Sequence, residues 1–360
     1  MSVLTKVAAW MTAAAAISMV SHAAALAQDL GVASARPAEA PAQFLSEAAQ
    51  LSGSPLTLTD GAQHSAHIFP TVSFAASVIG TDTGPLVYHA GGSIMPRLNI
   101  YSIFWKPATL QNGKPAVMSA AYRTILTNLA EDYVGHGIHN NSTQYYQTIG
   151  GVTTDVSGLV FSVAGIGSDA ASYLDTGAYP SSGCTDTKTP GNCITDAQLQ
   201  TELLRVMALK GWTGGLDKIF VVYTAQNEGS CFDSGSSSCA YVQYCAYHSH
   251  TVANPPVIYA NMPYGNTAVC QEPGEPSPNA NPAADAASTS ASHEMTESVT
   301  DPLLNAWYTS QGNEIGDLCA YNYGTNGYDG SLANQSWNGH FYLLQQEFDN
   351  HAGGCVQIGP

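Results

Sequence analysis

Basic residues are scarce in this chain. Its 360 residues include 10 Lys and Arg against 27 Asp and Glu, so the formal net charge is −17. No Lys or Arg follows Lys218. Proteins that bind nucleic acid or an anionic membrane surface do so through clustered positive charge. The sequence therefore predicts no nucleic-acid partner, and the acids of its second half have no cationic side chains nearby in the sequence.

Several sequence signatures of known chemistry are also missing. No G-x-S-x-G turn is present, which argues against a serine hydrolase of the nucleophile-elbow type. Neither G-x-G-x-x-G nor a P-loop occurs, so no nucleotide cofactor is expected. After the N-terminal region, no stretch reaches the roughly 18 to 20 apolar residues that a membrane-spanning helix needs. We therefore expect no membrane span.

The first 27 residues have the pattern of a secretory signal peptide. Lys6 supplies a positive charge, residues 7–20 are apolar and rich in alanine, and Ala25-Leu26-Ala27 fits a small-residue cleavage site. A membrane anchor is the weaker alternative, because the apolar run is short for a span. The sequence thus predicts a secreted protein, either extracellular or periplasmic.

Composition divides the rest of the chain in two. Residues 28–85 are rich in Ala, Ser, Pro and Thr and show little periodicity, so we expect a flexible arm or a pro-segment there. From Leu86 onward, patterns of strands and helices follow one another. Residues 86–360 are long enough for one good core or two small lobes. We expect a single α/β domain there, in a monomeric protein.

Strands are predicted where β-branched and aromatic residues are enriched, at residues 98–105, 158–163, 218–224 and 256–260. The segment 218–224 is almost continuously apolar, which favours a central place in its sheet. Helical spacing predicts a helix over 116–133. A second helix is predicted from Thr195, which forms a capping box with Gln198, to a stop at Gly211. This alternation predicts an α/β fold with a mixed β-sheet flanked by helices.

Cysteine use agrees with export. The chain has eight cysteines, all in its second half: Cys184, Cys193, Cys231, Cys239, Cys245, Cys270, Cys319 and Cys355. An even number in an exported chain predicts disulfides. The short loops 184–193 and 231–239 are the natural first pairs, which leaves 245–270 and 319–355, although other pairings stay open. Zinc binding by thiolates is the rival interpretation, and it lacks any C-x-x-C pair.

The main candidate for chemistry is a helix predicted over residues 282–299. Asn281 would cap it, and a proline fits its first position. His293 and Glu297 are four residues apart and share one face of the helix. They can bind one cation, while Glu294 beside them stays free to act on a bound water.

Two further acids follow this helix. Glu314 and Asp317 lie in a compact acidic segment after a turn, and Cys319 could pin that segment in place. If the chain folds back, one of these carboxylates can provide a third metal ligand. The plainer alternative is that H-E-x-x-E is a solvated helix face. However, clustered acids without partners repel one another at a cost that grows with burial, and a bound cation would remove that cost.

The motif resembles a known active helix. Residues 293–301, His-Glu-Met-Thr-Glu-Ser-Val-Thr-Asp, look like the helix of thermolysin-like gluzincin metallopeptidases, whose pattern is H-E-x-x-H. In that family a glutamate in an N-E-x-x-S-D context follows, and residues 313–317 stand at a similar distance. The resemblance implies a zincin-like core, with His293 as zinc ligand, Glu294 as general base and Glu314 as third ligand.

The chain departs from that family at one ligand. The second histidine of the family pattern is Glu297 here. A His/Glu/Glu set makes the metal a weaker Lewis acid and favours harder cations. Asp317 would then position a ligand or serve as an alternative ligand itself.

A second resemblance is spread over residues 86–355. The sequences Leu-Val-Tyr-His at 86–89, Cys-Ala-Tyr-His-Ser at 245–249 and Val-Thr-Asp-Pro-Leu-Leu-Asn-Ala-Trp-Tyr at 299–308 resemble the phosphate-induced, or exordium-like, protein family of plants and its bacterial relatives. The closing segment 342–355 is similar to secreted bacterial members. This resemblance implies an extracellular protein of poorly defined activity.

These observations lead to three functional hypotheses. The first is a secreted metal-dependent hydrolase acting on a peptide or protein substrate, in which His293, Glu297 and Glu314 hold Zn²⁺ and Glu294 takes a proton from water. The second is a non-catalytic exordium-like protein whose acids bind Ca²⁺ or no metal. The third is a cell-wall or carbohydrate-binding module that uses its Tyr and Trp side chains. His248 is an additional candidate ligand, although buried or surface histidines without function are commoner.

Overall fold

The structure is a computed structural model that describes residues 54–60, 64–80, 82–158, 172–235, 238–324 and 331–359. By its contacts the chain divides into two units, residues 1–44 and residues 45–360, and every described residue belongs to the second unit. The predicted signal peptide lies outside the described residues, and so do residues 159–163 of a predicted strand.

Seven strands form the main sheet, in the order β1-β2-β11-β12-β9-β4-β7. They are β1 (Thr57–Thr59), β2 (Ser65–Pro70), β11 (Tyr244–His250), β12 (Ile258–Met262), β9 (Lys218–Thr224), β4 (Asn99–Trp105) and β7 (Ser172–Asp175). From β1 to β12 neighbouring strands are antiparallel, whereas from β12 to β7 they are parallel. The sheet is therefore mixed, as predicted.

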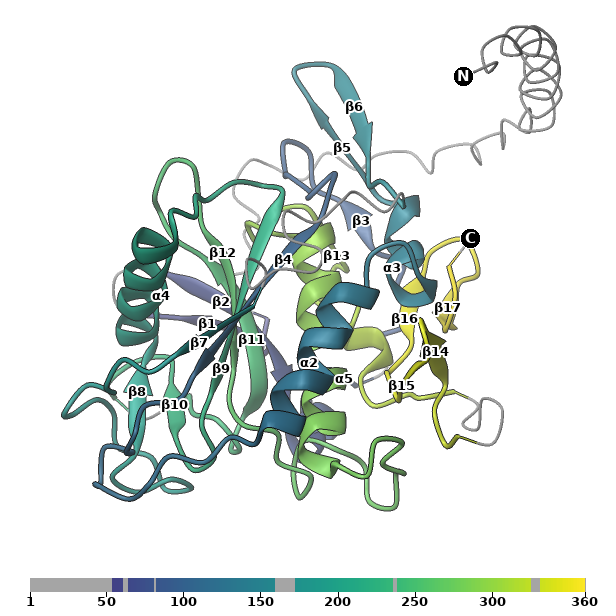
Figure 1. Cartoon of the computed structure of the whole chain (residues 1–360). Helices are drawn as coiled ribbons and strands as arrows, with labels where there is room; N and C mark the ends of the chain where they lie inside the picture. Colours follow the sequence, from purple (N-terminus) through teal and green to yellow (C-terminus); the bar gives the residue numbers. More distant parts are fainter. Residues whose placement is uncertain are drawn as a thin grey trace, which may run out of the picture. The chain divides into compact units, whose positions relative to one another are not determined.

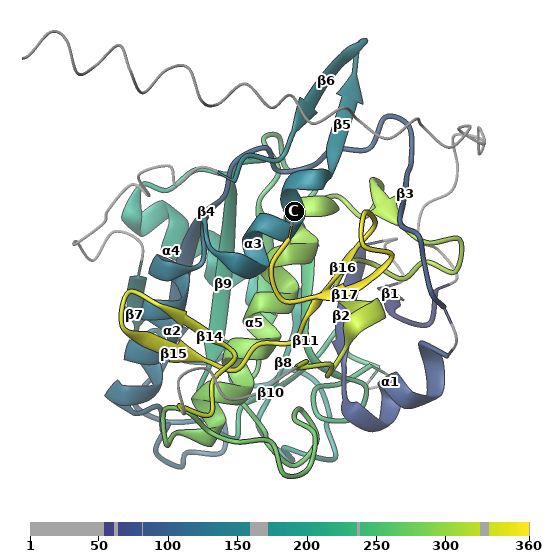
Figure 2. The same ribbon diagram turned by 90° about the vertical axis from the view of Figure 1, so that its right-hand side faces the viewer.

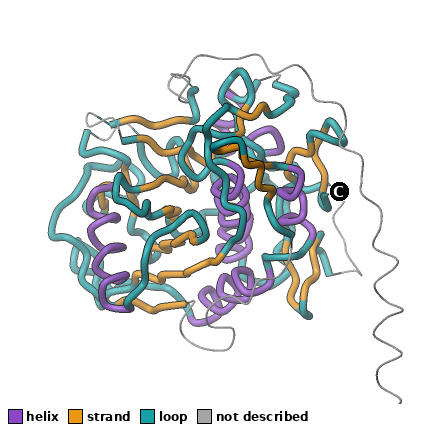
Figure 3. The backbone as a smooth tube through the Cα atoms, turned by 90° about the horizontal axis from the view of Figure 1, so that it is seen from above, coloured by secondary structure: helices purple, strands orange, loops and turns teal. Residues whose placement is uncertain are grey.

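Helices cover both faces of this sheet. They are α1 (Val72–Val78), α2 (Ala120–Asp132), α3 (Gly137–Asn141), α4 (Asp196–Lys210) and α5 (Pro282–Thr300), with 3₁₀ turns at Ser142–Gln144 and Asp317–Cys319. Helices α2 and α5 lie together on one face and α4 lies on the other, as Figures 1 and 3 show. The α/β class is confirmed. No helix among the described residues combines the length and the apolar character needed to cross a bilayer.

The remaining strands form five small pairs. These are β8 (Cys193–Thr195) with β10 (Gly229–Cys231), β3 (Val87–Tyr88) with β13 (Trp307–Tyr308), β5 (Tyr146–Ile149) with β6 (Val152–Asp155), β14 (Gln335–Trp337) with β15 (His340–Tyr342), and β16 (Glu347–Asp349) with β17 (Gly354–Val356). The two C-terminal hairpins lie on the side of α5 that faces away from the sheet (Figures 1 and 2). Helix α5 is thus enclosed between the sheet and these hairpins.

Local sequence patterns account for several elements. Strand β9 is buried from Ile219 to Thr224 and pairs on both edges with parallel neighbours, as its apolar run predicts. In α4 the capping box of Thr195 and Gln198 is formed, and Gly211 ends the helix in the left-handed conformation at φ +68°. Helix α2 begins later than predicted, because Ser119 caps it by accepting a bond from the Tyr122 N–H.

The prediction and the structure differ most over residues 28–85, which were predicted to form a flexible arm or a pro-segment. Within residues 28–85, the structure places β1, β2 and α1, and β2 lies inside the main sheet between β1 and β11. Order therefore begins well before Leu86, and the flexible prediction is wrong for this part. The composition of residues 28–85 did not predict β2, because this strand is stabilised by pairing with β11, which is far away in the sequence.

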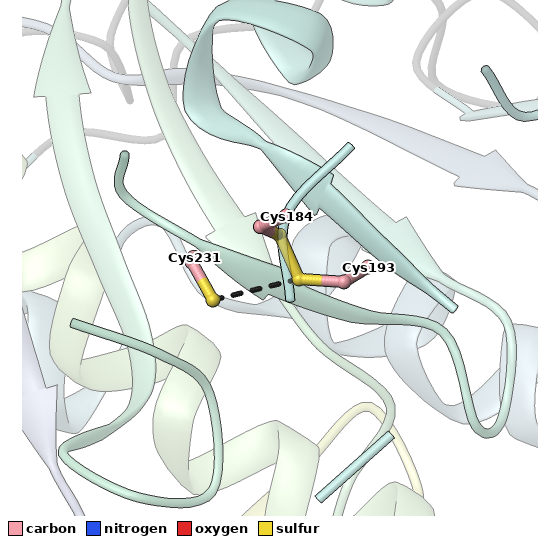
Figure 4. A group of neighbouring side chains, drawn as sticks. All are labelled: Cys184, Cys193 and Cys231. Carbon is pink, nitrogen blue, oxygen red and sulfur yellow. Dashed lines mark hydrogen bonds between the residues drawn. A yellow bond between two sulfur atoms is a disulfide. The ribbon is translucent and has the colours of Figure 1, made fainter. Parts of the chain in front are cut away.

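The eight cysteines form four disulfides. The pairs are Cys184–Cys193, Cys231–Cys239, Cys245–Cys270 and Cys319–Cys355. These are the pairs favoured by the sequence spacing, and no cysteine is free. The first two bridges are adjacent, since the sulfurs of Cys193 and Cys231 lie 3.4 Å apart (Figure 4). Oxidation of all the sulfurs rules out a thiolate zinc site there.

Candidate metal centre

Helix α5 carries the predicted site and is unusually enclosed. Asn281 caps it, Pro282 occupies its first turn, and every residue from Ala284 to Thr300 is buried. Ala, Ser and Thr dominate this stretch, so neighbouring elements can approach the helix axis closely. Some of its buried hydroxyls are satisfied within the helix; Ser288 and Thr296, for example, donate to the carbonyls four residues earlier, whereas the hydroxyls of Ser292 and Ser298 have no hydrogen-bond partner. The alternative of a solvated helix face is therefore wrong.

Two strands of the sheet bring histidines toward this helix. In the antiparallel pairing of β2 with β11, His67 lies directly opposite His248. Residues opposite each other on neighbouring strands project from the same face of the sheet. The two rings lie with their centroids 6.0 Å apart, and both side chains are fully buried.

The acidic segment after α5 folds back against the helix. Gly316 makes this possible, because a Cβ there would lie 2.4 Å from Nδ1 of His293 and 3.0 Å from Oε1 of Glu297. The backbone N–H of Glu314 donates to Oδ2 of Asp317 at 2.7 Å, which fixes the turn. The next residues reach Cys319, whose disulfide to Cys355 ties the segment to β17.

The four residues predicted as ligands lie close together. The Nε2 atom of His293 is 3.0 Å from Oε1 of Glu297 and 3.8 Å from Oδ1 of Asp317. Glu297 and Glu314 offer oxygens within 4.8 Å of each other and of His248. On its other side His293 accepts a bond through Nδ1 from the Gln345 amide, at 2.9 Å. That bond orients the ring so that Nε2 points into the cluster.

Both carboxylate oxygens of Glu294, the predicted general base, have a polar partner. Its Oε1 accepts the backbone N–H of Phe69 at 3.0 Å, and its Oε2 lies 3.1 Å from Nδ1 of His248. The side chain is fully buried. In this arrangement Glu294 joins helix α5 to β2 and β11, and its role as a base stays a prediction.

Sequence reasoning did not identify His67 and gave His248 little weight. Both are central here: His67 lies 2.7 Å from Oδ2 of Asp317 and 3.6 Å from Oε1 of Glu314, and His248 lies 3.8 Å from Oε2 of Glu314. The aromatic-rich run around His248 is typical of a strand and was a usable signal. No local signal points to His67, since its neighbours come from strand pairing.

The cluster shifts the acid–base properties of its members. Burial raises the pKa of Glu297 and of Glu314 well above the ordinary value, and it raises that of Glu294 to about 8. Burial alone would lower the pKa of His67, but the charge and hydrogen bond of Asp317, together with the charges of Glu297 and Glu294, outweigh burial and raise that pKa to about 9. His67 correspondingly lowers the pKa of Asp317 despite burial. Anionic carboxylates are thus costly here unless a positive charge compensates them.

Some polar atoms of the cluster lack ordinary hydrogen bonds. Neither oxygen of Glu314 accepts one, and Nε2 of His248 has none either. Both oxygens of Glu297 also lack one, although the Gly316 backbone N–H lies close enough to lower the pKa of this carboxyl. Buried polar groups almost always have partners, and an exception calls for an explanation such as an ion. These atoms converge on one enclosed region of the molecule.

Comparison with known proteins gives a partial likeness. No family model matches the chain, and no solved structure matches it, so a zincin-like core and a gluzincin-like site stay predictions. The chain is similar to Protein EXORDIUM-like 3 of Arabidopsis thaliana, with 34% identity over 121 residues. That match covers 27% of this chain and 35% of the plant protein. The likeness points toward the exordium-like family, over about a third of the relative's own length.

Proposed function

We propose that this chain is an extracellular exordium-like protein without hydrolytic activity, in which a divalent cation is held at the contact between α5, β2, β11 and the acidic segment 313–317. The four disulfides fit an extracellular protein, and the partial likeness to the plant protein supports the family. No peptide substrate is required by this proposal.

One observation carries the cation. Glu314 is fully buried, and neither of its carboxylate oxygens accepts a hydrogen bond. The rings of His67 and His248 lie 3.6 and 3.8 Å from these oxygens, which is too far for a hydrogen bond. A cation between these groups would satisfy the carboxylate and the imidazole nitrogen together.

The ligand set favours zinc over calcium. Imidazole nitrogens suit zinc, whereas calcium takes oxygen ligands at longer distances. The centre offers His67, His248 and His293 beside its carboxylates. Zn²⁺ is therefore the first ion to test, with Ca²⁺ as the alternative.

The test is to refold the protein from urea with its disulfides intact, once with zinc and once with EDTA. We expect bound zinc by mass spectrometry and an unfolding temperature several degrees higher in the zinc sample, because a ligand of the folded state stabilises it. Glu314→Gln should reduce both effects. The exposed Glu131→Gln on α2 is the control and should change neither. A wild-type protein that retains no zinc and no calcium would refute the proposal.

A metallopeptidase-like hydrolase is the second candidate. Its support is the contact of His293 with Glu297 at 3.0 Å, which the H-E-x-x-E motif requires. Its weakness is that His293, Glu294, Glu297 and Glu314 are all fully buried, while hydrolysis needs access for a substrate. Cleavage of a fluorogenic peptide mixture by wild type, lost in Glu294→Gln, would favour this candidate over the non-catalytic one.

A further inference from the structure

Glu297 faces a histidine with each of its two carboxylate oxygens, as Glu314 and Asp317 also do. Its Oε1 lies 3.0 Å from Nε2 of His293, and its Oε2 lies 3.6 Å from Nδ1 of His248. The two oxygens of one carboxylate can bind two different metal ions at once. This geometry distinguishes Glu297 from Glu294, whose oxygens bond to a backbone amide and to His248.

Two groups of potential ligands share this residue. The first is His67, Glu297 and Asp317, and the second is His248, Glu297 and Glu314. Within each group, one ligand atom per residue lies within 4.8 Å of the others, and all five side chains are fully buried. Ligands bound to zinc at about 2.0–2.2 Å lie within about 4.4 Å of one another. The ligand atoms of each group therefore lie close enough together to share one ion after small side-chain adjustments.

Charge gives a second reason for bound cations. The two groups and the adjoining Glu294 contain four carboxylates, counting Glu297 once. No Lys or Arg follows Lys218 in the sequence, and among the described residues the ion pairs within this cluster all involve histidine. Burial raises the pKa of Glu294, Glu297 and Glu314, so these groups keep their protons without a cation, and a bound divalent ion would allow them to ionise. An uncompensated buried charge is strongly destabilising.

We infer that the centre is binuclear, with Glu297 bridging two divalent cations. Asp317 and His67 hold the first cation, near His293, and Glu314 and His248 hold the second. Zn²⁺ is the ion class that this mixture of imidazole and carboxylate takes. Bridged pairs of this kind place the two ions about 3.5–4 Å apart. The inference rests on the proposed function and deepens it by fixing the number of ions and their ligands.

Counting ions tests the inference. Protein refolded in excess zinc with intact disulfides is treated briefly with EDTA to strip surface ions, desalted and analysed by mass spectrometry. We expect two zinc ions per chain in wild type and one in each of Asp317→Asn and Glu314→Gln. Glu228→Gln is the matched control, because Glu228 is also fully buried but lies outside the centre, and this variant should keep two ions.

The outcomes separate the two proposals. One zinc per wild-type chain would overturn the binuclear centre and leave the proposed function intact. No zinc in wild type would overturn both. If a variant fails to fold, refolding the wild-type protein with increasing amounts of Co²⁺ provides the test. The absorption of the bound ions should rise to an endpoint at two equivalents of Co²⁺, and the two ions should be magnetically coupled. An endpoint at one equivalent, without coupling, refutes the inference.

Discussion

At the residue scale, Gly316 controls how closely the acidic segment approaches α5. Its φ is −78°, so any residue could adopt its backbone conformation, and the requirement for glycine is purely steric. The atoms that an added Cβ would meet belong to His293 and Glu297, which are themselves packed in the core and cannot retreat.

We therefore predict that Gly316→Ala destabilises the protein by about 1–3 kcal/mol, the usual cost of overpacking. Urea unfolding with intact disulfides measures it. Gly354→Ala is the control, because a Cβ at Gly354 meets nothing within 4 Å. Equal stability of the two variants would show that the segment does not press against α5 in solution.

Glu228 is a buried acid outside the candidate centre. Burial raises its pKa from 4.5 to about 8. The folded state therefore keeps a proton that the unfolded state releases from about pH 4.5 upward. The contribution of Glu228 to stability is fully present below pH 4.5 and is lost as the pH rises toward 8.

We predict that Glu228→Gln is more stable than wild type by about 1–3 kcal/mol at pH 8, and that its advantage shrinks toward pH 5. The free energy of unfolding at both pH values measures this. Glu131→Gln, at an exposed acid, should show no such trend. A constant difference between Glu228→Gln and wild type would contradict the assigned titration.

At the element scale, α5 has almost no free surface. Ala291 is fully buried, and the helix packs against α2 and the sheet on one side and the C-terminal hairpins on the other. We predict that Ala291→Leu costs about 1–3 kcal/mol through overpacking. Ala208→Leu, on the exposed face of α4, should be nearly neutral. Thermal unfolding of both variants makes the comparison, and a neutral Ala291→Leu would show that α5 has room to move.

Elements with strong local signals were predicted well. The apolar run of β9, the capping box of α4 and the proline start of α5 each specify their element through contacts a few residues apart. The pair His293 and Glu297 was found for the same reason, since helical spacing alone brings them together.

Elements that depend on distant partners were predicted poorly. Strand β2 is a short segment with a histidine and a terminal proline, and its burial comes from pairing with β11. The register in which two distant segments pair cannot be recognised from the sequence pattern of either segment alone. His67, which β2 contributes, was therefore not predicted, although it lies 2.7 Å from Asp317.

At the scale of the whole molecule, the first described strands are part of the core. We predict that a chain starting at Leu86 does not fold, because it lacks β1 and β2 and leaves one edge of β11 unpaired. A chain starting at Leu45, which keeps the entire second unit, is the comparison. Circular dichroism and urea unfolding distinguish them. A cooperative transition in the shorter chain would show that β2 is dispensable.

The histidines and carboxylates of the centre come from β2, β11, α5 and the segment after it, and all are sealed from solvent. An ion enclosed in this way can exchange only when the sheet and α5 separate. Its residence time would then follow the opening rate of the fold rather than an ordinary dissociation constant. Which metal the mature protein carries would be decided by the ions present at the moment of folding, and later changes in the surroundings would leave it unaltered.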